Sequence, residues 1–284
     1  MKLQGKNIVI TGGSLGIGFA VAKKCVAEGA QVVIAARNQK DLLRSVAELK
    51  GSPGAAVRSY SLDVSDLNKV KAFASWCVNE VGDISGLVNC AGVYGPIGRT
   101  TAVSLQEFKE AMNINFMGAV YMCSIFAPIM KSHSRKKIVS YSGGGAASPF
   151  PNYSAYATSK IAIVRYTENI AIELAAENID VNCIAPGFVI TRLHQQTLAV
   201  GSEAAGASFY EGTKKQMESG GVPPEKAADL TAFLLSADSD GITGKFISAP
   251  WDPWDSPEFL STLRSDKDFC TIRRIDNKSF FKKT

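Results

Sequence analysis

The sequence predicts an α/β fold of the Rossmann type, in which a single doubly wound parallel sheet of about seven strands carries helices on both faces. Three observations support this prediction. Short β-branched runs alternate with longer segments of helical period almost from the first residue. The apolar runs within these segments do not alternate with polar residues, so both faces of the sheet should be buried. A glycine-rich turn also joins the first run to the first helical segment.

Each predicted strand is followed by a predicted helix, which is the order that parallel strands require because their connection must cross a face of the sheet. The strands are "NIVIT" from Asn7, "QVVIAA" from Gln31, "AVRSYSL" from Ala56, "SGLVN" from Ser85, "KKIVSYS" from Lys136, "IDVNCIA" from Ile179 and "ITGKFIS" from Ile242. The helices lie near residues 17–29, 40–50, 66–81, 104–131, 153–178 and 225–236.

We interpret residues 1–249 as one dinucleotide-binding and catalytic domain and residues 250–284 as a C-terminal extension. Residues 193–224 interrupt the strand-helix rhythm, and they are predicted to form either a flap over the substrate or a plain solvent loop. The extension begins with "PWDPWDSPEF". Two neighbouring tryptophans are costly to leave in water, so we expect them to dock on the body of the protein.

The composition is that of a soluble globular protein, with 46% hydrophobic and 20% charged residues. The formal charge is +5, but residues 262–284 alone carry seven basic and three acidic side chains, so the body is nearly neutral and nucleic-acid binding is not expected. The longest apolar run, 116–130, is too short for a membrane span and contains Ser124 and Pro128. It predicts a buried helix and no membrane partner.

The six cysteines are scattered without a CxxC pair, and no secretory signal precedes them. They are typical of buried thiols in a reducing compartment, so a cytoplasmic location is expected. The sequence has only two histidines, His133 and His194, and no cysteine cluster to join them. We therefore expect surface histidines and no metal site.

The glycine-rich turn reads "TGGSLGIG" from Thr11 to Gly18 and leads directly into a helix. Gly12 permits a tight turn, Gly16 lets backbone amides approach an anion, and Gly18 lets the helix pack on the strand. Phosphate groups would then face the helix N-terminus. The predicted contacts to the nucleotide are Gly12, Ser14, Leu15, Gly16, Ile17 and Gly18.

The end of the second strand indicates which dinucleotide binds. An acidic side chain there would hydrogen-bond a ribose 2′-hydroxyl, whereas a basic one would pair with a 2′-phosphate. The chain has Arg37 at this point, and the nearest acid, Asp41, follows Asn38 at a helix start as a capping-box partner would. NADP(H) is therefore favoured over NAD(H), with a solvated surface charge as the other interpretation of Arg37.

Several further motifs occur in a fixed order, and together they resemble the short-chain dehydrogenase/reductase (SDR) superfamily in its single-domain branch. The resemblance covers Gly5 to about Ile247. Its motifs are TGGSLGIG, "LDV" from Leu62, "NCAG" from Asn89, "INFMG" from Ile114, Tyr156-x-x-x-Lys160, "PGFVIT" from Pro186 and "ITG" from Ile242. The chain departs from the family after the last strand, where "SAPWDPWD" replaces the usual apolar-Asp-Gly-Gly ending, and in its longer tail.

The resemblance implies three further groups of cofactor contacts. One group would meet the adenine ring, a second would close the cofactor cleft and steady the central strand, and a third would contact the nicotinamide side. In this order they are Asp63 and Val64; Asn89, Ala91 and Gly92; and Pro186, Gly187, Val189 and Thr191.

Tyr156 and Lys160 stand four residues apart, so on a helix they share one face. A phenol with a pKa near 10 exchanges protons poorly at neutral pH, but a neighbouring ammonium and the positive nicotinamide favour its ionised form. The resemblance implies that Tyr156 is the acid and base of a hydride transfer. It also implies that Lys160 holds the nicotinamide ribose and that Asn115 anchors a water that replaces the proton.

The family also uses a serine that hydrogen-bonds the substrate oxygen, and this chain has Gly143 at that position. Ser142 is one residue early, and a regular strand would aim it at the opposite face. The glycines that follow allow a bulge or turn, so we predict that Ser142 is rotated into the site. Ser148 or a backbone amide is the alternative holder of the oxyanion.

The function predicted from these residues is an NADP(H)-dependent oxidoreductase that interconverts a carbonyl and a secondary alcohol. One alternative is an SDR-type epimerase or dehydratase with recycled cofactor, and another is a non-catalytic nucleotide-binding module. Residues 113–130 and 153–176 are apolar over wide arcs. Because the family packs these helices against their copies, a homodimer or homotetramer is expected, with a thick monomer core as the alternative.

Overall fold

The protein is built on one seven-stranded parallel sheet, with the strand order β3-β2-β1-β4-β5-β6-β7. This description rests on a computed structural model, which describes residues 1–51, 54–130 and 134–275. The strands are β1 (Asn7–Thr11), β2 (Gln31–Ala36), β3 (Val57–Ser61), β4 (Gly86–Asn89), β5 (Lys136–Tyr141), β6 (Ile179–Ala185) and β7 (Phe246–Ser248). The predicted doubly wound fold is therefore confirmed.

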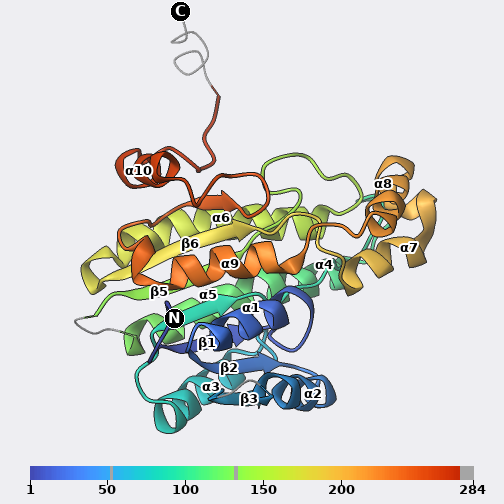
Figure 1. Ribbon diagram of the computed structural model, residues 1–284. Helices are drawn as coiled ribbons and strands as arrows, with labels where there is room; N and C mark the ends of the chain where they lie inside the picture. The colour runs from blue at the N-terminus through green and yellow to red at the C-terminus, as the bar shows by residue number, and fades with distance from the viewer. Residues whose placement is uncertain (52–53, 131–133, 276–284) are drawn as a thin grey trace, which may run out of the picture.

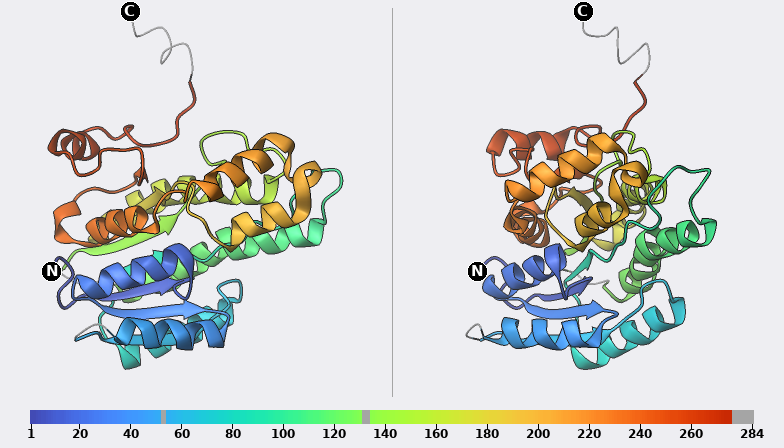
Figure 2. Two further views of the ribbon diagram at one scale, coloured as in Figure 1. Left: turned by 45° about the vertical axis from the view of Figure 1, so that its right-hand side comes forward. Right: turned by 90° about the vertical axis from the view of Figure 1, so that its right-hand side faces the viewer.

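Helices cover both faces of the sheet (Figures 1 and 2). One face packs against α1, α2 and α9, and the other packs against α3, α5 and α6. The helices are α1 (Gly16–Ala27), α2 (Gln39–Lys50), α3 (Leu67–Glu80), α4 (Leu105–Met112), α5 (Gly118–Ile129), α6 (Ser154–Glu173), α7 (Arg192–Ala205), α8 (Ala207–Glu218), α9 (Pro224–Leu235) and α10 (Pro257–Ser265). Short η segments are η1 (Asn113–Met117), η2 (Ala175–Glu177) and η3 (Ala237–Ser239).

Alternation along the strands sends successive side chains to opposite faces. Ile8 and Ile10 of β1 join the core beneath α1 and α9, whereas Val9 joins the core beneath α3 and α5. All three are buried. The apolar strand runs are thus explained by a sheet that is covered on both sides.

The chain leaves β1 toward β2 and β3 on one side, and it returns to the other side of β1 with β4. The strand order therefore reverses between β1 and β4. At such a switch point the two flanking connections diverge, which leaves a crevice at the carboxyl ends of the strands where ligands bind in open α/β sheets. This edge is where the predicted site residues must be sought.

The segment predicted as a flap or a solvent loop is helical. It forms α7 and α8, with a break at Gly201, whose φ is 81°. Figure 2 shows both helices at the end of the molecule that the strand carboxyl termini face. The prediction of a plain solvent loop was wrong, because α7 and α8 pack on the body through an aromatic cluster.

Strand β7 is shorter than predicted. The expected run began at Ile242, but the strand starts at Phe246, because Gly244 has a φ of 72° and continues a turn. The carbonyl of Val181 in β6 accepts from the amide of Gly244, which fixes this turn beside the sheet. β-branched residues within a turn misled the prediction.

The extension contains a helix, α10, that the sequence did not predict. Trp254 docks as expected, since its ring lies 5.8 Å from Phe233 and its Nε1 donates to the carbonyl of Ala249 at 3.2 Å. Trp251, in contrast, is 73% exposed, so the expectation that both tryptophans dock was wrong.

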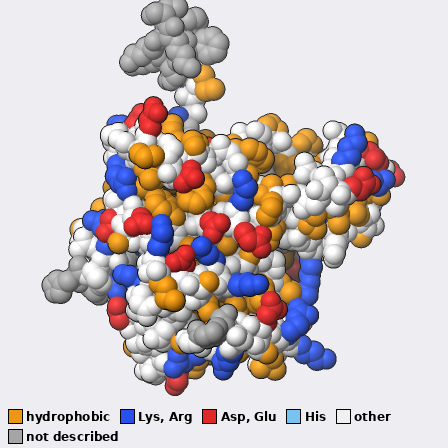
Figure 3. Space-filling view, viewed as in Figure 1, with side chains coloured by type: hydrophobic (Ala, Val, Ile, Leu, Met, Phe, Trp, Pro, Cys, Tyr) orange, Lys and Arg blue, Asp and Glu red, His pale blue; other side chains and the backbone are white. Residues whose placement is uncertain are grey.

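Acidic and basic side chains are interspersed on the face of the molecule that Figure 3 shows.

One helical stretch among the described residues, Leu105–Ile129, is long and apolar enough to cross a membrane by length and composition alone. Within the fold it packs on the sheet through residues such as Met122 and Phe126, which are fully buried. A core helix passes the same test, so this observation is weak support for a membrane span.

Candidate active site

The predicted site residues come from segments that all end or begin at the carboxyl edge of the sheet. The phosphate loop follows β1, Arg37 follows β2, the Asp63 loop follows β3 and the NCAG segment ends β4. Ser142 follows β5, the PGFVIT segment follows β6, and Tyr156 and Lys160 lie on α6. The topology thus gathers seven separate segments at the crevice that the switch point opens.

The phosphate loop is as tight as its glycines predict. A Cβ atom at Gly18 would lie 2.3 Å from the carbonyl oxygen of Gly12, and one at Gly12 would lie 2.9 Å from the backbone of Ala91. No side chain larger than hydrogen fits at either position. A Cβ at Gly16 would lie 3.3 Å from the Thr191 side chain, so the PGFVIT segment closes against this loop.

The N-terminus of α1 suits an anion. Its N-cap, Leu15, provides no side-chain hydrogen bond, and the first turn carries no acidic residue. The first amides of the helix are therefore left for another acceptor, and the helix dipole favours negative charge there. The loop itself is held from behind, because Ser45 Oγ of α2 donates to the Ser14 carbonyl at 2.7 Å. These features fit the diphosphate of a dinucleotide.

The end of β2 leaves Arg37 exposed beside the crevice. Asn38 caps α2 by accepting from the Asp41 amide at 3.0 Å, but the Asp41 carboxylate does not complete the predicted capping box, because it faces two arginines instead. The Asp41 carboxylate forms ion pairs with Arg44 at 3.2 Å and with Arg192 of α7 at 3.1 Å. With its carboxylate neutralised in this way, Asp41 is a poor candidate for binding a ribose hydroxyl.

Asn115 lies in the π-helical turn η1, between α4 and α5. Such turns insert one residue into a helix and often occur at functional sites. The Asn115 amide donates to the Val93 carbonyl at 2.8 Å and to Ser159 Oγ at 2.9 Å, and its Oδ1 accepts from the Val93 amide at 2.8 Å. Both side-chain N–H donors of Asn115 are thus used, and this side chain links the segment that follows NCAG to helix α6.

Tyr156 and Lys160 share one face of α6, as their spacing predicts. Lys160 Nζ lies 5.4 Å from the centroid of the Tyr156 ring and donates to the carbonyl of Tyr141 at 2.8 Å. A Cβ at Gly92 would lie 3.3 Å from Asn115 Oδ1 and 3.5 Å from Lys160 Nζ. The missing side chain at position 92 therefore leaves room beside both polar groups.

Burial governs the protonation of this pair. It raises the pKa of Tyr156 well above that of a free phenol, and the nearby Cys90 thiol adds to the increase. It lowers the pKa of Lys160 to about 8. In the chain alone burial thus outweighs any effect of Lys160 on Tyr156. The expected lowering of the Tyr156 pKa, which also invokes the positive nicotinamide, stays a prediction for the cofactor-bound protein. Tyr156 is held as a phenol, which is the form that donates a proton.

Ser142 does not turn toward Tyr156. It is buried, and its Oγ donates to the backbone carbonyl of Lys160 at 3.0 Å. Gly143 takes the position facing the tyrosine, since a Cβ there would lie 2.6 Å from the Tyr156 hydroxyl oxygen. The predicted rotation of Ser142 into the site was wrong, because the chain leaves β5 without a bulge that would reverse the residue.

We expect Ser142→Ala to keep its turnover and to lose stability. The substitution leaves the Lys160 carbonyl without the hydroxyl donor, and a buried hydrogen bond of this kind contributes about 1 kcal/mol to the free energy of unfolding. Urea denaturation and steady-state rates of the variant measure the two effects. A large loss of kcat at unchanged stability would instead indicate that Ser142 touches the substrate.

An aromatic cluster beside Tyr156 was not predicted. The Tyr94 ring lies edge-on to Tyr156 at 4.8 Å and to Tyr153 at 5.1 Å, and Phe150 stacks on Tyr153 at 4.4 Å. Phe209 of α8 meets both Phe150 and Tyr153 edge-on. These rings come from three distant segments, so local spacing connects Phe150 with Tyr153 and Tyr156 but not with Tyr94 or Phe209.

His194 belongs to the same region and is buried, so the prediction of a surface histidine was wrong. Its ring lies 3.9 Å from that of Phe188, and its Nδ1 faces the amide and hydroxyl of Thr191 in a capping box of α7. Burial lowers its pKa to about 4, so the imidazole is neutral at physiological pH. His133 lies outside the described residues.

A hollow of about 850 Å³ lies next to the cluster. It is lined by Phe150, Phe188 and several residues of α8, among them Phe209. The size is within the range of small-molecule sites. Within residues 1–51, 54–130 and 134–275, no group of three or more histidine, cysteine or acidic side chains is placed to hold a metal ion.

An open parallel sheet with an uncapped glycine-loop helix and a Tyr–Lys pair at its switch point defines a dinucleotide-binding protein. Comparison with known proteins specifies the family. A model described as short chain dehydrogenase matches residues 6–199. The chain is 30% identical over 245 residues to dehydrogenase/reductase SDR family member 4 of Sus scrofa. The aligned region covers 86% of each of the two chains.

Other relatives and solved structures agree. The chain is 32% identical over 249 residues to the uncharacterized oxidoreductase YxbG of Bacillus subtilis (strain 168), covering 87% of this chain and 90% of that one. Among solved structures, an NAD⁺-bound xylitol dehydrogenase superposes with a TM-score of 0.81 at 27% identity, covering 87% and 98% of the two chains. A levodione reductase gives 0.80 at 27% identity, covering 89% and 98%.

The chain therefore belongs to the short-chain dehydrogenase/reductase superfamily, as its motifs predicted. The family match and the relatives make it an NAD(P)-dependent oxidoreductase.

Proposed function

We propose that the protein is an NADP(H)-dependent oxidoreductase that interconverts a carbonyl group and a secondary alcohol, with Tyr156 as the acid and base. The observation that carries the proposal is the placement of Tyr156. Its phenol stands at the switch-point crevice beside Lys160, and Gly143 leaves its hydroxyl oxygen uncovered by a side chain at that position. The alternatives of a recycled-cofactor epimerase and of a non-catalytic module have no observation of their own in their favour.

The chain's residues divide the work between binding and proton transfer. The amides at the start of α1 hold the diphosphate, and the segment from Pro186 to Thr191 closes over the nicotinamide side. The bound nicotinamide supplies or accepts the hydride. Because burial keeps Tyr156 protonated, it donates its proton to the substrate oxygen during reduction. In the oxidation direction its phenolate form, which Lys160 and the positive nicotinamide would favour, takes the proton from the alcohol.

Lys160 and Asn115 support the tyrosine. Lys160 has N–H groups beyond the one donated to Tyr141, and these would hold the nicotinamide ribose. The room left by Gly92, between Asn115 Oδ1 and Lys160 Nζ, suits a water that returns the proton to Tyr156. Asn115 would then accept a hydrogen bond from this water through the remaining lone pair of Oδ1. Its two hydrogen bonds to the Val93 backbone hold the side chain in place.

The proposal is tested by following the absorbance of NADPH with a panel of ketones and aldehydes, and with NADP⁺ and secondary alcohols in the reverse direction. Steady consumption of added NADPH supports it. Tightly bound cofactor without net consumption would favour the recycled-cofactor alternative. No turnover with any carbonyl or alcohol, despite measurable NADPH binding, would favour the binding module.

Arg37 supports the preference for NADP(H). It is exposed at the end of β2, while Asp41 is neutralised by two arginines. We expect Arg37→Ala to raise the Kd for NADPH about tenfold or more, because a charge-assisted bond to phosphate is lost, and to leave the Kd for NADH unchanged. Quenching of protein fluorescence by each cofactor measures both values.

Arg58→Ala is the matched control, since Arg58 is an exposed arginine on the neighbouring strand β3. Equal affinity of the wild-type protein for NADPH and NADH would contradict the preference. The comparison with NADH is needed because the xylitol dehydrogenase with the same fold was solved with NAD⁺.

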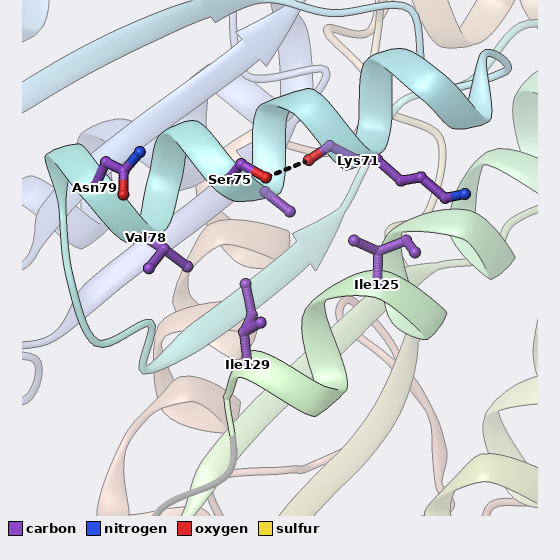
Figure 4. Close-up of a pocket in the computed structure, with 7 residues that line it drawn as sticks. Lys71, Ser75, Val78, Asn79, Ile125 and Ile129 are labelled. Atoms are coloured by element: carbon purple, nitrogen blue, oxygen red, sulfur yellow. Dashed lines mark hydrogen bonds between the residues drawn. The ribbon is translucent and has the colours of Figure 1, made fainter.

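Self-association through α5 and α6 completes the proposal, as a homodimer or homotetramer. Ile125 and Ile129 of α5 and Val78 of α3 line a surface groove of about 370 Å³ (Figure 4). Ile172 of α6 is 80% exposed. Exposed apolar side chains on α5 and α6 favour contact with a second chain. A mass of one chain in sedimentation at high protein concentration would contradict this assembly.

A cytoplasmic location is the last part of the proposal. All six cysteines are free and most are buried, which suits a reducing compartment. Fractionation of cells that express the tagged protein tests it, and recovery with membranes or in the secreted fraction would contradict it.

A further inference from the structure

Strand β7 ends the sheet, so one of its edges has no neighbouring strand. Such an edge presents unpaired amide and carbonyl groups and is a template for pairing with another chain. Here both outward amides of β7 are already bonded. The Phe246 amide donates to the carbonyl of Cys270 at 2.7 Å, and the Ser248 amide donates to Asp252 Oδ2 at 2.7 Å. Cys270 belongs to the far part of the C-terminal extension, whereas Asp252 lies in the turn directly after β7, so the Phe246 amide is the one that the far segment covers.

A buried lysine fixes the same segment to the strand. Lys245, immediately before β7, is 4% exposed. Its Nζ donates to the carbonyls of Asp266 at 2.6 Å and Phe269 at 3.0 Å. Removing an ammonium from water is costly unless it is hydrogen-bonded, and here the extension provides the acceptors. The lysine and the segment therefore depend on each other.

The segment then continues to α6 and bonds there as well. The Ile272 carbonyl accepts from Arg165 at 2.9 Å, and Arg273 pairs with Glu168 at 2.6 Å. The Ile272 side chain packs against a buried cluster that includes Ile163 of α6. Polar bonds and apolar burial at both ends thus hold this segment along the outer side of β7, the side of the sheet where Figure 1 shows α10.

We propose that residues 266–273 form an intramolecular cap on the β7 edge, which prevents a second copy of this chain from adding its own β7 to the sheet. Two copies of one edge strand are self-complementary about a twofold axis, so the excluded partner is the chain itself. The cap lies outside residues 6–199, the part that the family model matches, and it uses the tail that departs from the family pattern. The inference does not depend on the proposed reaction.

Truncation tests the cap. A chain ending at Ser265 loses the cap, whereas a chain ending at Ile275 keeps every described contact and is the matched control. Sedimentation velocity over a wide range of concentration is expected to give the control the mass of the wild type, and the shorter chain about twice that mass at high concentration. A synthetic peptide of residues 266–275 should reverse the doubling. A folded shorter chain with the wild-type mass would overturn the proposal.

A full-length variant keeps the proposal testable if the truncated chain fails to fold. Lys245→Met removes the ammonium that holds the two carbonyls but keeps the apolar stem. Hydrogen exchange followed by mass spectrometry is expected to show the Phe246 amide exchanging about tenfold faster or more, since the bonded segment is loosened. Lys267→Met, at an exposed lysine in the same segment, is the control. Unchanged exchange in Lys245→Met would overturn the cap.

Discussion

Tyr156→Phe is expected to lower kcat about a thousandfold while leaving the affinity for NADPH near that of the wild type. The phenyl ring keeps its edge-on contact with Tyr94, so the fold and the cofactor crevice are retained. Only the hydroxyl is lost, and proton transfer by a positioned side chain contributes about 10² to 10⁴ to the rate. Single-turnover rates of NADPH oxidation measure the loss without interference from product release.

Tyr153→Phe provides a matched control three residues away. The Tyr153 hydroxyl donates to Thr197 Oγ1 at 2.9 Å and lies within the aromatic cluster. Its removal should cost about 1 kcal/mol of stability and change kcat only a few-fold. If the two variants lost the same activity, the effect would belong to the packing of the cluster. If Tyr156→Phe kept its turnover, another group would have to supply the proton.

The fold could be predicted from the sequence because its signals are local. Apolar runs bounded by turn residues gave the bounds of β1 and β2, since a strand buried on both faces has no polar alternation to interrupt the run. The failures are nonlocal. Helices α7 and α8 form from a segment of weak periodicity, and their packing through rings such as Phe209 makes the helical state favourable.

The candidate site was predictable in part for the same reason. The phosphate loop and the Tyr156–Lys160 pair are each contained in one segment, so spacing along the chain places them. The directions of Ser142 and Gly143 depend on how the chain leaves β5, which no residue pattern specifies. The burial of His194 depends on contacts with Phe188 and Tyr94, from two other loops. Sequence reasoning treated that histidine as polar because its neighbours in space were unknown.

The site also illustrates that function can oppose stability. A buried ammonium is costly, and the low pKa of Lys160 measures that cost, since its proton is held less tightly in the folded chain than in water. Natural proteins retain such groups where activity requires them. Replacing Lys160 therefore separates the requirement for catalysis from the requirement for folding.

Lys160→Met is expected to lose most of its activity and yet to unfold less readily than the wild type at neutral pH. A pKa of about 8 against 10.5 for a free lysine corresponds to a cost of roughly 3 kcal/mol. The lost bond to the Tyr141 carbonyl offsets about 1 kcal/mol of the gain. The free energy of unfolding should thus rise by about 2 kcal/mol, measured in urea.

The gain in the free energy of unfolding of Lys160→Met has a defined pH dependence. Between pH 8 and about 10.5 the unfolded wild-type chain binds more protons at this lysine than the folded chain does, so the stability of the wild type rises with pH in that window. The variant has no such group. Its advantage should be complete below about pH 8 and should disappear above about 10.5. A variant less stable than the wild type across this range would show that the ammonium of Lys160 stabilises the fold instead of burdening it.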